Sequence, residues 1–530
     1  MFHYDVSIIS CRLSSSARAY IPLGPMYIVS ALEKAGYKAQ LIDYQNFENA
    51  NLFNVPAFVD AIESAKSDIV GISLFGDALP LVLASIRIYQ AHFGEKTFIL
   101  GGPGVNGNEI SILKKFPEVH TLVRGEGENT LPQILHCLST NTILRTPGVY
   151  TRDEKGNPFG NEPLRIKDIN TIPWPDYNQI QAENYAQMSL VTSRGCPFDC
   201  SFCEIITMWG RSTSFRNIDD VVDELKKVKE RTGHSTFDFI DDTFTLNKKR
   251  VLALCQAIID TDLNINWSCF SRIDTIDEEM MDIMARAGCN SVFFGIDTGS
   301  ELVWREINKR LSRQQVLEVV EKSLNYFSLT ASYIWGYPDE TYQDFTETIS
   351  LAFEVAQIAR QKPNFLTTQV HFLSPTKSTP IYQQHHEKLV FSESMPLEVC
   401  GAYELNAFQY HEGYELCLPF IKSDKELFAP YYYYDSPGLD QKWQAIRGGT
   451  KIVDAVIGQA VLSPNRQAII SQNVEQMQQA AGVDTIESVA AMYAFIKLSA
   501  IQSDQKITQI INTLPPLNLL PKLEMANLTF

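Results

Sequence analysis

The sequence predicts an α/β protein made of two successive parallel-sheet units and a mostly helical C-terminal region. Two patterns predict this fold class. Short apolar runs alternate with amphipathic helical stretches up to about residue 395, as in parallel strands that are joined by helices. Beyond that point only helical periods follow, over residues 441–461, 465–481 and 485–502. A chain of 530 residues is also long enough for two or three domains.

The first predicted unit spans residues 1–150. Its strands are predicted at residues 6–10, 39–43, 69–73, 97–100 and 121–123, and a helix over 25–35 ends before Gly36. Glycine-rich turns follow two of these strands, at residues 101–104 and 125–128. Because ligands of open parallel sheets bind at the carboxyl ends of the strands, these turns are candidate ligand contacts. Tight turns would explain the glycines equally well.

A second unit follows a connector. Residues 151–187 are rich in proline, asparagine and aspartate, which is typical of a linker. The second unit spans residues 188–395, with strands predicted at 189–192, 237–240, 266–270, 291–296, 329–335 and 367–373. This strand–helix repeat predicts a parallel barrel. For residues 396–530 we expect a substrate-binding or accessory region.

Three cysteines carry the most informative motif. Cys196, Cys200 and Cys203 form a C-x3-C-x2-C cluster on one short stretch. Thiolates are the usual ligands of iron–sulfur clusters, which normally take four of them. One iron would therefore lack a nearby thiolate and could bind an external ligand. A zinc site would more often show paired C-x2-C motifs, and a disulfide framework would need a secretory context. The motif therefore favours an iron–sulfur cluster with one open iron.

This motif, with the aromatic Phe202 before the third cysteine, resembles the signature of the radical S-adenosylmethionine (SAM) superfamily. The resemblance implies a partial (β/α)6 TIM-type barrel and a [4Fe–4S] cluster on the three cysteines. It also implies that SAM chelates the open iron and is cleaved reductively to methionine and a 5′-deoxyadenosyl radical. An external electron donor such as flavodoxin or ferredoxin is then expected.

Candidate SAM contacts follow the predicted barrel strands. Asp241 and Asp242 come after the second strand, where a carboxylate could accept hydrogen bonds from the SAM ammonium group. A solvated loop or a helix N-cap would explain this acid pair as well. Arg272 follows the third strand, and its planar fork suits the SAM carboxylate. The alternative for Arg272 is a salt bridge to Asp274 or Asp277.

Two further positions depend on the resemblance alone. The run 295–300 resembles the family's fourth-strand motif, but Asp297 stands where the family usually has glutamate. The resemblance gives Asp297 a SAM-binding role, and its shorter side chain leaves the exact contact open. The run 336–341 resembles the family's Gly-x-Pro-x-Glu-Thr turn near the adenine, where apolar neighbours such as Ile334 are expected.

The first unit resembles the Rossmann-like, cobalamin-binding-type domain that precedes many radical SAM barrels. The matching pieces are residues 21–24, 70–73, 101–103 and 123–128. One departure concerns the cobalt ligand. The Asp-x-His-x-x-Gly run of some cobalamin domains is absent, since Tyr-Gln-Asn follows Asp43. Some relatives bind cobalamin without that histidine and others bind none, so the resemblance favours cobalamin without requiring it.

Three reactions fit this organisation. The domain order favours cobalamin-dependent methyl transfer to an unactivated carbon or a phosphinate, which makes the chain a probable radical SAM methyltransferase. Epimerisation of a residue in a ribosomal peptide would need a thiol that returns a hydrogen atom, for which Cys400 and Cys417 are candidates. For each of them, a buried structural cysteine is the stronger explanation. Ring formation or carbon–carbon coupling is the third reaction. A non-enzymatic iron–sulfur protein is a further alternative, but it would not need Asp241, Arg272 and Asp297, the candidate SAM contacts.

Composition restricts the partners. A net charge of −17 argues against binding to nucleic acid or to anionic membranes, which requires a basic surface. No apolar run is long enough to span a membrane, and unpaired thiols with an oxygen-sensitive cluster suit a reducing cytoplasm. We therefore expect a small-molecule or peptide substrate.

Overall fold

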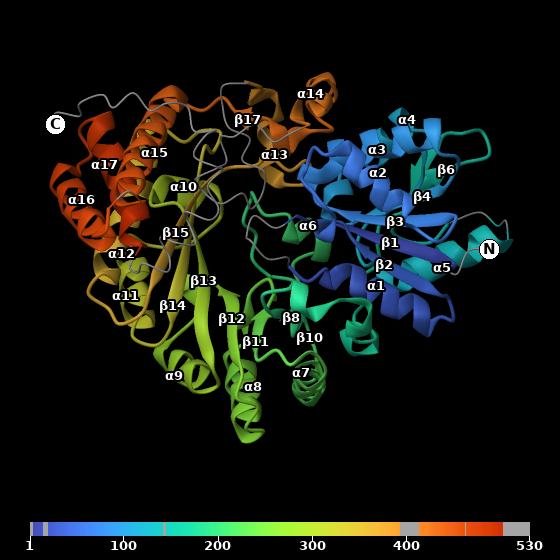
Figure 1. Cartoon of the computed structure of the whole chain (residues 1–530), viewed down its shortest axis with the longest axis horizontal. Helices are drawn as coiled ribbons and strands as arrows, with labels where there is room; N and C mark the ends of the chain where they lie inside the picture. Colours follow the sequence, from blue (N-terminus) through green and yellow to red (C-terminus); the bar gives the residue numbers. More distant parts are fainter. Residues whose placement is uncertain are drawn as a thin grey trace.

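The computed structural model describes residues 4–13, 20–140, 142, 145–392, 413–461 and 463–501. Within them the chain forms two parallel-sheet units, with the last helices packed on the second unit (Figure 1). This arrangement confirms the predicted α/β fold class. Among the described helices, none has both the length and the apolar content that crossing a bilayer requires.

The N-terminal unit is a seven-stranded sheet in the order β2-β1-β3-β4-β5-β6-β7. Its strands are β1 (Val6–Cys11), β2 (Ala39–Asp43), β3 (Ile69–Leu74), β4 (Thr97–Gly101), β5 (Val119–Val123), β6 (Val149–Arg152) and β7 (Pro158–Gly160). The first five strands pair in parallel. Every residue of β1 is buried, as expected of a strand that is covered on both faces.

Helices flank this sheet on both faces. They are α1 (Leu23–Lys34), α2 (Val55–Glu63), α3 (Leu79–His92), α4 (Glu109–Lys115) and α5 (Gly127–Thr140). Helix α1 packs against α5, and α2 packs against α3. This doubly wound arrangement leaves the carboxyl ends of the parallel strands, with their glycine turns, at one edge of the sheet.

The N-terminal sheet continues into the segment that the sequence predicted to be linker. Strands β6 and β7 form an antiparallel hairpin on the edge of β5, so residues up to Gly160 belong to this sheet. The hairpin turn is closed by a hydrogen bond from Gly156 N to Asp153 O, and Gly156 has a φ of 81°. The N-terminal unit therefore extends beyond the boundary predicted at residue 150. Residues 153–157 form a hairpin turn, whereas the sequence predicts a linker there because the whole stretch is rich in proline and asparagine.

The second unit is an open sheet of six parallel strands in the order β8-β11-β12-β13-β14-β15. They are β8 (Met188–Leu190), β11 (Thr236–Phe239), β12 (Asn266–Ser271), β13 (Cys289–Asp297), β14 (Ser328–Trp335) and β15 (Leu366–Phe372). Two short strands, β9 (Ser193–Arg194) and β10 (Ser214–Phe215), pair separately. The six predicted strands match this sheet within about three residues at either end, and the single edge-to-edge order agrees with a partial barrel.

The helices of the second unit are α6 (Ile205–Trp209), α7 (Ile218–Thr232), α8 (Lys248–Asp260), α9 (Glu278–Arg286), α10 (Glu301–Glu306), α11 (Arg313–Ser323) and α12 (Tyr342–Ala359). Helix α7 shows why these segments are helical. Asp219 and Asp220 occupy its first turn, and Lys229 and Arg231 its last turn, so its side chains complement the helix dipole. Gly233, with a φ of 71°, ends the helix in the left-handed conformation that favours glycine.

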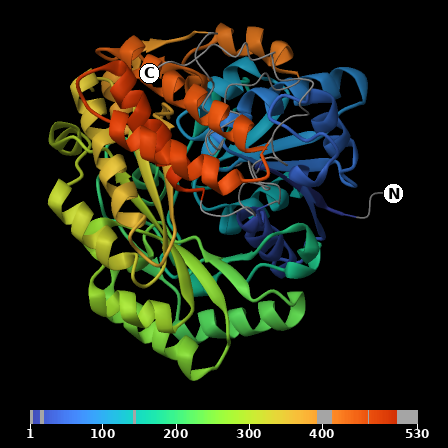
Figure 2. The same cartoon turned by 60° about the vertical axis from the view of Figure 1, so that its left-hand side comes forward.

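The described chain after β15 is mostly helical, in agreement with the mostly helical C-terminal region that the sequence predicted. It contains α13 (Pro380–His385), β16 (Leu389–Val390), α14 (Tyr414–Ser423), β17 (Tyr433–Tyr434), α15 (Leu439–Val461), α16 (Arg466–Ala480) and α17 (Ile486–Ser499). Helices α15 and α17 pack against each other and against α12, whereas α14 packs against α3 of the N-terminal unit. Figures 1 and 2 show these helices in orange and red along one side of the molecule. The C-terminal region thus contacts both units.

Candidate functional site

The three motif cysteines lie on a loop of residues 195–203, which we call the cysteine loop. It begins after β9, beyond the carboxyl end of β8. Its first residue, Gly195, has a φ of 97°, and a Cβ there would lie 2.2 Å from the Ser212 carbonyl oxygen. Asp242 fixes the same residue by accepting a hydrogen bond from Gly195 N at 2.7 Å. The loop therefore requires glycine at its start.

The thiols of the cysteine loop are close enough to influence one another. Cys200 is buried, and Cys196 and Cys203 are half-buried. Burial, followed by the nearby Cys200 and Cys196 thiols, raises the pKa of Cys203 to about 12. Because metal binding requires thiolates, the positive charge of bound iron would have to offset this shift. Among the described residues, no three histidine, cysteine or acidic side chains converge as one metal ion requires.

The two acids after β11 have different surroundings. Asp241 is 2% exposed, and its carboxylate accepts hydrogen bonds from Thr192 N, Thr192 Oγ1 and Ser193 Oγ, each at 2.6 Å. These bonds hold the chain that enters the cysteine loop, so Asp241 differs from the accessible ammonium acceptor that we predicted. Asp242 lines a cavity, and burial raises its pKa to about 6.

Arg272 contacts the cysteine loop directly. It forms a two-point ion pair with Asp274, with both N–O distances at 2.8 Å. Its Nη1 also donates to Cys200 Sγ at 3.4 Å, and its guanidinium lies 3.7 Å from the Phe198 ring centroid. The structure therefore has the predicted alternative, the Asp274 salt bridge, and also places the cation beside a motif cysteine.

Asp297 ends β13 in a constrained conformation. Its φ is 71°, in the left-handed region. The buried Lys309 ammonium donates to Asp297 Oδ2 and to Gly295 O, and it is 3% exposed. Sequence reasoning missed Lys309, because nothing in its local sequence indicates a buried partner 12 residues away.

Two cavities adjoin the cysteine loop. The first, of about 420 Å³, lies between the carboxyl ends of the N-terminal strands and the second unit; we call it the domain cavity. The second, of about 390 Å³, contains Phe202 and Ile334 in its wall; we call it the barrel cavity. Phe202 packs edge-on against Tyr337, with ring centroids 6.1 Å apart. Phe75 and Pro103 line both cavities.

Glycines form much of the domain cavity's wall. They are Gly24, Gly71, Gly101, Gly102, Gly125 and Gly127. A Cβ on Gly24 would meet nothing within 4 Å, whereas one on Gly102 would lie 2.7 Å from Leu74 O. Gly24 therefore borders open space, whereas a Cβ at each of the other five would meet neighbouring protein atoms. At all six positions the wall is main chain, against which a large cofactor could lie. These residues fit a bulky cofactor such as cobalamin.

Arg194 joins the two units at this cavity. It donates to Glu126 Oε1 at 2.9 Å and to Glu128 Oε1 at 2.6 Å, and its guanidinium lies 5.1 Å from the Tyr27 ring centroid. All four side chains line the domain cavity. The sequence indicated Glu126 and Glu128 only as members of a turn, so this link to the cysteine loop was missed.

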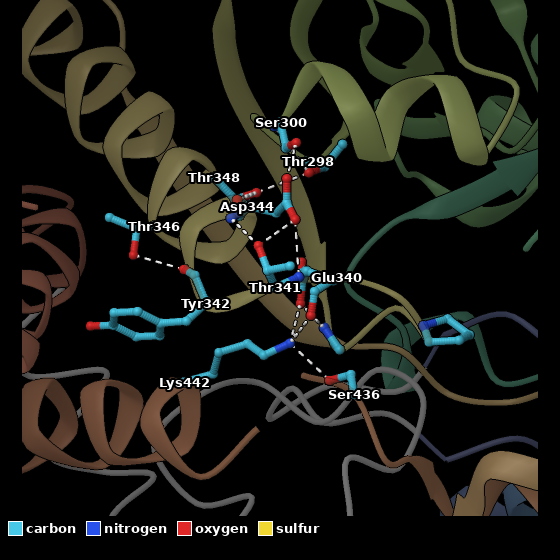
Figure 3. A network of polar contacts seen from close by, with 12 residues as sticks. Thr298, Ser300, Glu340, Thr341, Tyr342, Asp344, Thr346, Thr348, Ser436 and Lys442 are labelled. Atoms are coloured by element: carbon cyan, nitrogen blue, oxygen red, sulfur yellow. Dashed lines mark hydrogen bonds and ion pairs between the residues drawn. The ribbon is translucent and has the colours of Figure 1, made fainter. Parts of the chain in front are cut away.

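The turn after β14 anchors the C-terminal region. Glu340 Oε2 accepts from Gly336 N at 2.7 Å and lies 3.2 Å from Lys442 Nζ of α15. Lys442 also donates to Glu340 O and Ser436 Oγ, and the side chains of Glu340 and Lys442 are both fully buried. Figure 3 shows this pair beside the Thr341–Asp344 capping box of α12.

A bond from Ser300 Oγ to Asp344 Oδ1, at 2.6 Å, extends the network to the run after β13. A Cβ on Gly336 would lie 2.2 Å from the Phe372 ring. The motif glycine and glutamate of this turn therefore shape it and fasten it to α15.

Of the two candidate hydrogen donors, Cys417 lies within the described residues. Cys417 lies in α14 with no exposed surface and lines neither cavity. Burial raises its pKa to about 11. This placement agrees with the alternative of a structural cysteine. Cys400 lies outside the described residues.

Glu204, which directly follows Cys203, was also missed. Its Oε1 accepts from Ser378 Oγ at 3.0 Å and from Asn106 Nδ2 at 3.4 Å. Both donors are neutral, and burial raises the pKa of Glu204 to about 7. Glu204 thus links the cysteine loop to both units at the barrel cavity.

Comparisons with known proteins agree with this architecture. The family model of the radical SAM superfamily matches residues 190–352, and that of the B12 binding domain matches residues 9–135. An uncharacterized methyltransferase of Pyrococcus horikoshii is 32% identical over 344 residues, which are 62% of this chain and 72% of that protein.

A second relative is the anaerobic magnesium-protoporphyrin IX monomethyl ester cyclase of Cereibacter sphaeroides. It is 24% identical over 399 residues, covering 70% of this chain but 61% of the cyclase. Among solved structures, the cobalamin-dependent SAM radical enzyme OxsB with aqua-cobalamin bound has a similar fold. It superposes with a TM-score of 0.66 at 13% identity over 96% of this chain and 80% of that one.

Proposed function

Because the chain belongs to the radical SAM superfamily and carries a B12-binding domain before its radical SAM domain, we propose that it is a cobalamin-dependent methyltransferase. One observation carries this proposal. The glycine turns of the B12-binding domain and the chain around the cysteine loop, including Arg194 and Asp242, form the walls of a single cavity. A cofactor held by the first unit would thus lie next to the radical source of the second.

We assign Cys196, Cys200 and Cys203 as the ligands of a [4Fe–4S] cluster. When bound, the cluster would supply the electron that cleaves SAM, and cobalamin would supply the methyl group. The reductant would be a small electron-transfer protein such as flavodoxin or ferredoxin, and this chemistry suits a reducing cytoplasm.

The remaining residues of the site bind and position. Arg272 donates to Cys200 Sγ, and a hydrogen bond to a cluster thiolate stabilises its charge. Asp242, in the cavity wall, is the accessible acid for a SAM ammonium group, whereas Asp241 braces the loop from below. We assign Asp297, paired with Lys309, a positioning role, and Phe202 and Ile334 the apolar wall that excludes water near the radical.

Ring formation is the second candidate, because one relative is named a cyclase. Epimerisation has no comparable support, since the described donor candidate Cys417 lines neither cavity. Cobalamin occupancy alone does not distinguish methyl transfer from ring formation. The fate of the SAM methyl group must be known as well. The test must therefore measure both.

The decisive experiment uses anaerobically reconstituted protein with the cobalamin-blocking variant Gly24→Leu. We expect about one cluster and one cobalamin per wild-type chain, and label from [methyl-¹⁴C]SAM on the protein-bound cobalamin. Gly24→Leu should retain the cluster and lose cobalamin, because its side chain projects into the open space beside residue 24. Gly458→Leu is the matched control, since a Cβ there also meets nothing within 4 Å.

Two results would overturn the proposal. The first is an intact cluster with no cobalamin bound to the wild type. The second is bound cobalamin that never acquires label, in which case ring formation would become the leading function.

A further inference from the structure

The barrel cavity has a chemical character that the cluster and cobalamin do not explain. Its polar residues come from the segments after β3 and β4, from Glu204 next to the cysteine loop, and from β15 and the chain after it. It shares Phe75 and Pro103 with the domain cavity, so it lies where a methyl acceptor could reach both cofactors. What its wall can bind is set by four side chains.

Asn106 and Asn108 present hydrogen-bond acceptors that have no partner. They are 4% and 6% exposed, and both line the barrel cavity. Asn106 Nδ2 donates to Glu204 Oε1, and Asn108 Nδ2 donates to Leu427 O, each at 3.4 Å. Because both partners can only accept, the amide orientations are determined and each Oδ1 is the remaining atom. Among the described residues, neither Oδ1 has a hydrogen-bond partner.

Two carboxyl groups lie in the same wall. Glu204 and Asp77 both line the barrel cavity, and Glu204 accepts hydrogen bonds from two neutral donors, Asn106 Nδ2 and Ser378 Oγ. The cation in this wall, Lys377, is already 3.4 Å from Glu426. His371 contacts Gln369 Oε1 at 3.0 Å. The wall therefore places two carboxyl groups and two amide oxygens, unpartnered among the described residues, beside a lysine that is already paired.

We propose that the barrel cavity binds the substrate through a cationic nitrogen group, an ammonium or a guanidinium, held by Glu204, Asn106 and Asn108. The inference rests on the proposed function, because it names the substrate class of the same site. Buried carboxylates and unpartnered amide oxygens both cost free energy, and one cation with several N–H groups satisfies both. A neutral donor could satisfy the amide oxygens but would give the Glu204 carboxyl group no charge partner.

The experiment compares two probes of nearly equal shape. Nα-acetyl-L-arginine amide (arginine amide below) carries a guanidinium, and Nα-acetyl-L-citrulline amide (citrulline amide below) replaces it with a neutral urea. Acetylation removes the α-ammonium group from both probes, so the guanidinium is the single cation that distinguishes them. Binding to the anaerobic holoenzyme is measured by calorimetry, together with n-butylamine as a simple ammonium probe. We expect arginine amide to bind at least ~10-fold more tightly than citrulline amide, a difference typical of one charge-assisted hydrogen bond.

Three variants locate the effect. Glu204→Gln should abolish the preference for the cation, and Asn108→Ala should weaken both probes several-fold because it removes an acceptor far from the motif cysteines in sequence. Glu183→Gln, at an exposed position, should change neither. Iron content is measured on every variant, since Glu204 is adjacent to Cys203.

The outcomes separate this inference from the proposed function. Equal affinities for the two amides, an unchanged preference in Glu204→Gln, or no binding of either cationic probe would overturn the inference, even if cobalamin binds and SAM is cleaved. Selective binding of the cation with no cobalamin bound would support the inference as a binding site and overturn methyl transfer.

Discussion

Removal of the Lys442 ammonium should destabilise the contact between the C-terminal helices and the second unit more than any surface change. In Lys442→Met, Glu340 would keep its buried carboxylate and lose its only cation within 4 Å among the described residues. At 3.2 Å and an effective dielectric constant of about 20, the attraction within the pair is about 5 kcal/mol. Breaking a buried pair on one side costs about 3–5 kcal/mol by measurement on other proteins.

The assay is hydrogen exchange of the α15 and α12 amides, because a chain with several domains does not unfold in one step. We expect Lys442→Met to lower the local opening free energy of α15 by about 3–5 kcal/mol. The double variant Glu340→Gln/Lys442→Met should recover at least about 1 kcal/mol of this loss, because it leaves no unpaired charge. Lys451→Met, exposed on the same helix, should cost less than about 0.5 kcal/mol.

Two results would refute this reasoning. The first is a loss below about 1 kcal/mol in Lys442→Met, the size of a surface pair. The second is strict additivity of the two single variants, which would mean that the side chains do not interact. Either result would mean that apolar packing of α15, and not the Glu340–Lys442 pair, stabilises the contact between the C-terminal helices and the second unit.

Three further predictions concern the cysteine loop and the N-terminal unit. Gly195→Ala should lower iron content several-fold, because its Cβ would clash with a backbone carbonyl, while Gly156→Ala, which has a positive φ and open space, should keep full iron. Arg194→Met should weaken cobalamin binding at least ~10-fold with the cluster intact, because it leaves Glu126 buried without its cation; unchanged affinity would contradict this. Burial raises the pKa of Asp43 to about 6, so the folded state holds a proton that the unfolded state loses near pH 4. Its contribution to stability is therefore greatest below pH 4 and falls by up to about 3 kcal/mol as pH rises from about 4 to about 6. Asp43→Asn should flatten the dependence of β2 amide exchange on pH between about 4 and 6, once intrinsic exchange rates are corrected, and an unchanged slope would exclude Asp43 as its source.

The strands and the cysteine loop could be predicted because their signals are local. Apolar runs and glycine turns lie within a few residues of one another, so β1, β3 and β4 were expected nearly where they are found. The radical SAM motif is equally local. Its three cysteines occupy eight residues.

The polar partners could not be predicted, because each joins segments far apart in the sequence. Glu126 and Arg194 are 68 residues apart, and Glu340 and Lys442 are 102 apart. The sequence around Arg194 and around Lys442 does not differ from the sequence around a solvent-exposed arginine or lysine. The role of Asp241 was missed for the same reason, since its donors lie on the preceding strand connection, 48 and 49 residues earlier. Among the features that sequence reasoning missed, the β6–β7 hairpin differs, because it had a local sequence signal in the turn from Asp153 to Gly156.

The wall that the two cavities share has a consequence for the order of events. Phe75 and Pro103 face the domain cavity on one side and the barrel cavity on the other. A ligand that moves this wall to fit one cavity changes the shape of the other, so the two occupancies are energetically coupled. Such coupling is reciprocal: whatever factor cobalamin applies to the affinity for substrate, substrate applies to the affinity for cobalamin. Phe75 and Pro103 are therefore the residues through which such coupling would act, and titrating each ligand in the presence of the other measures it.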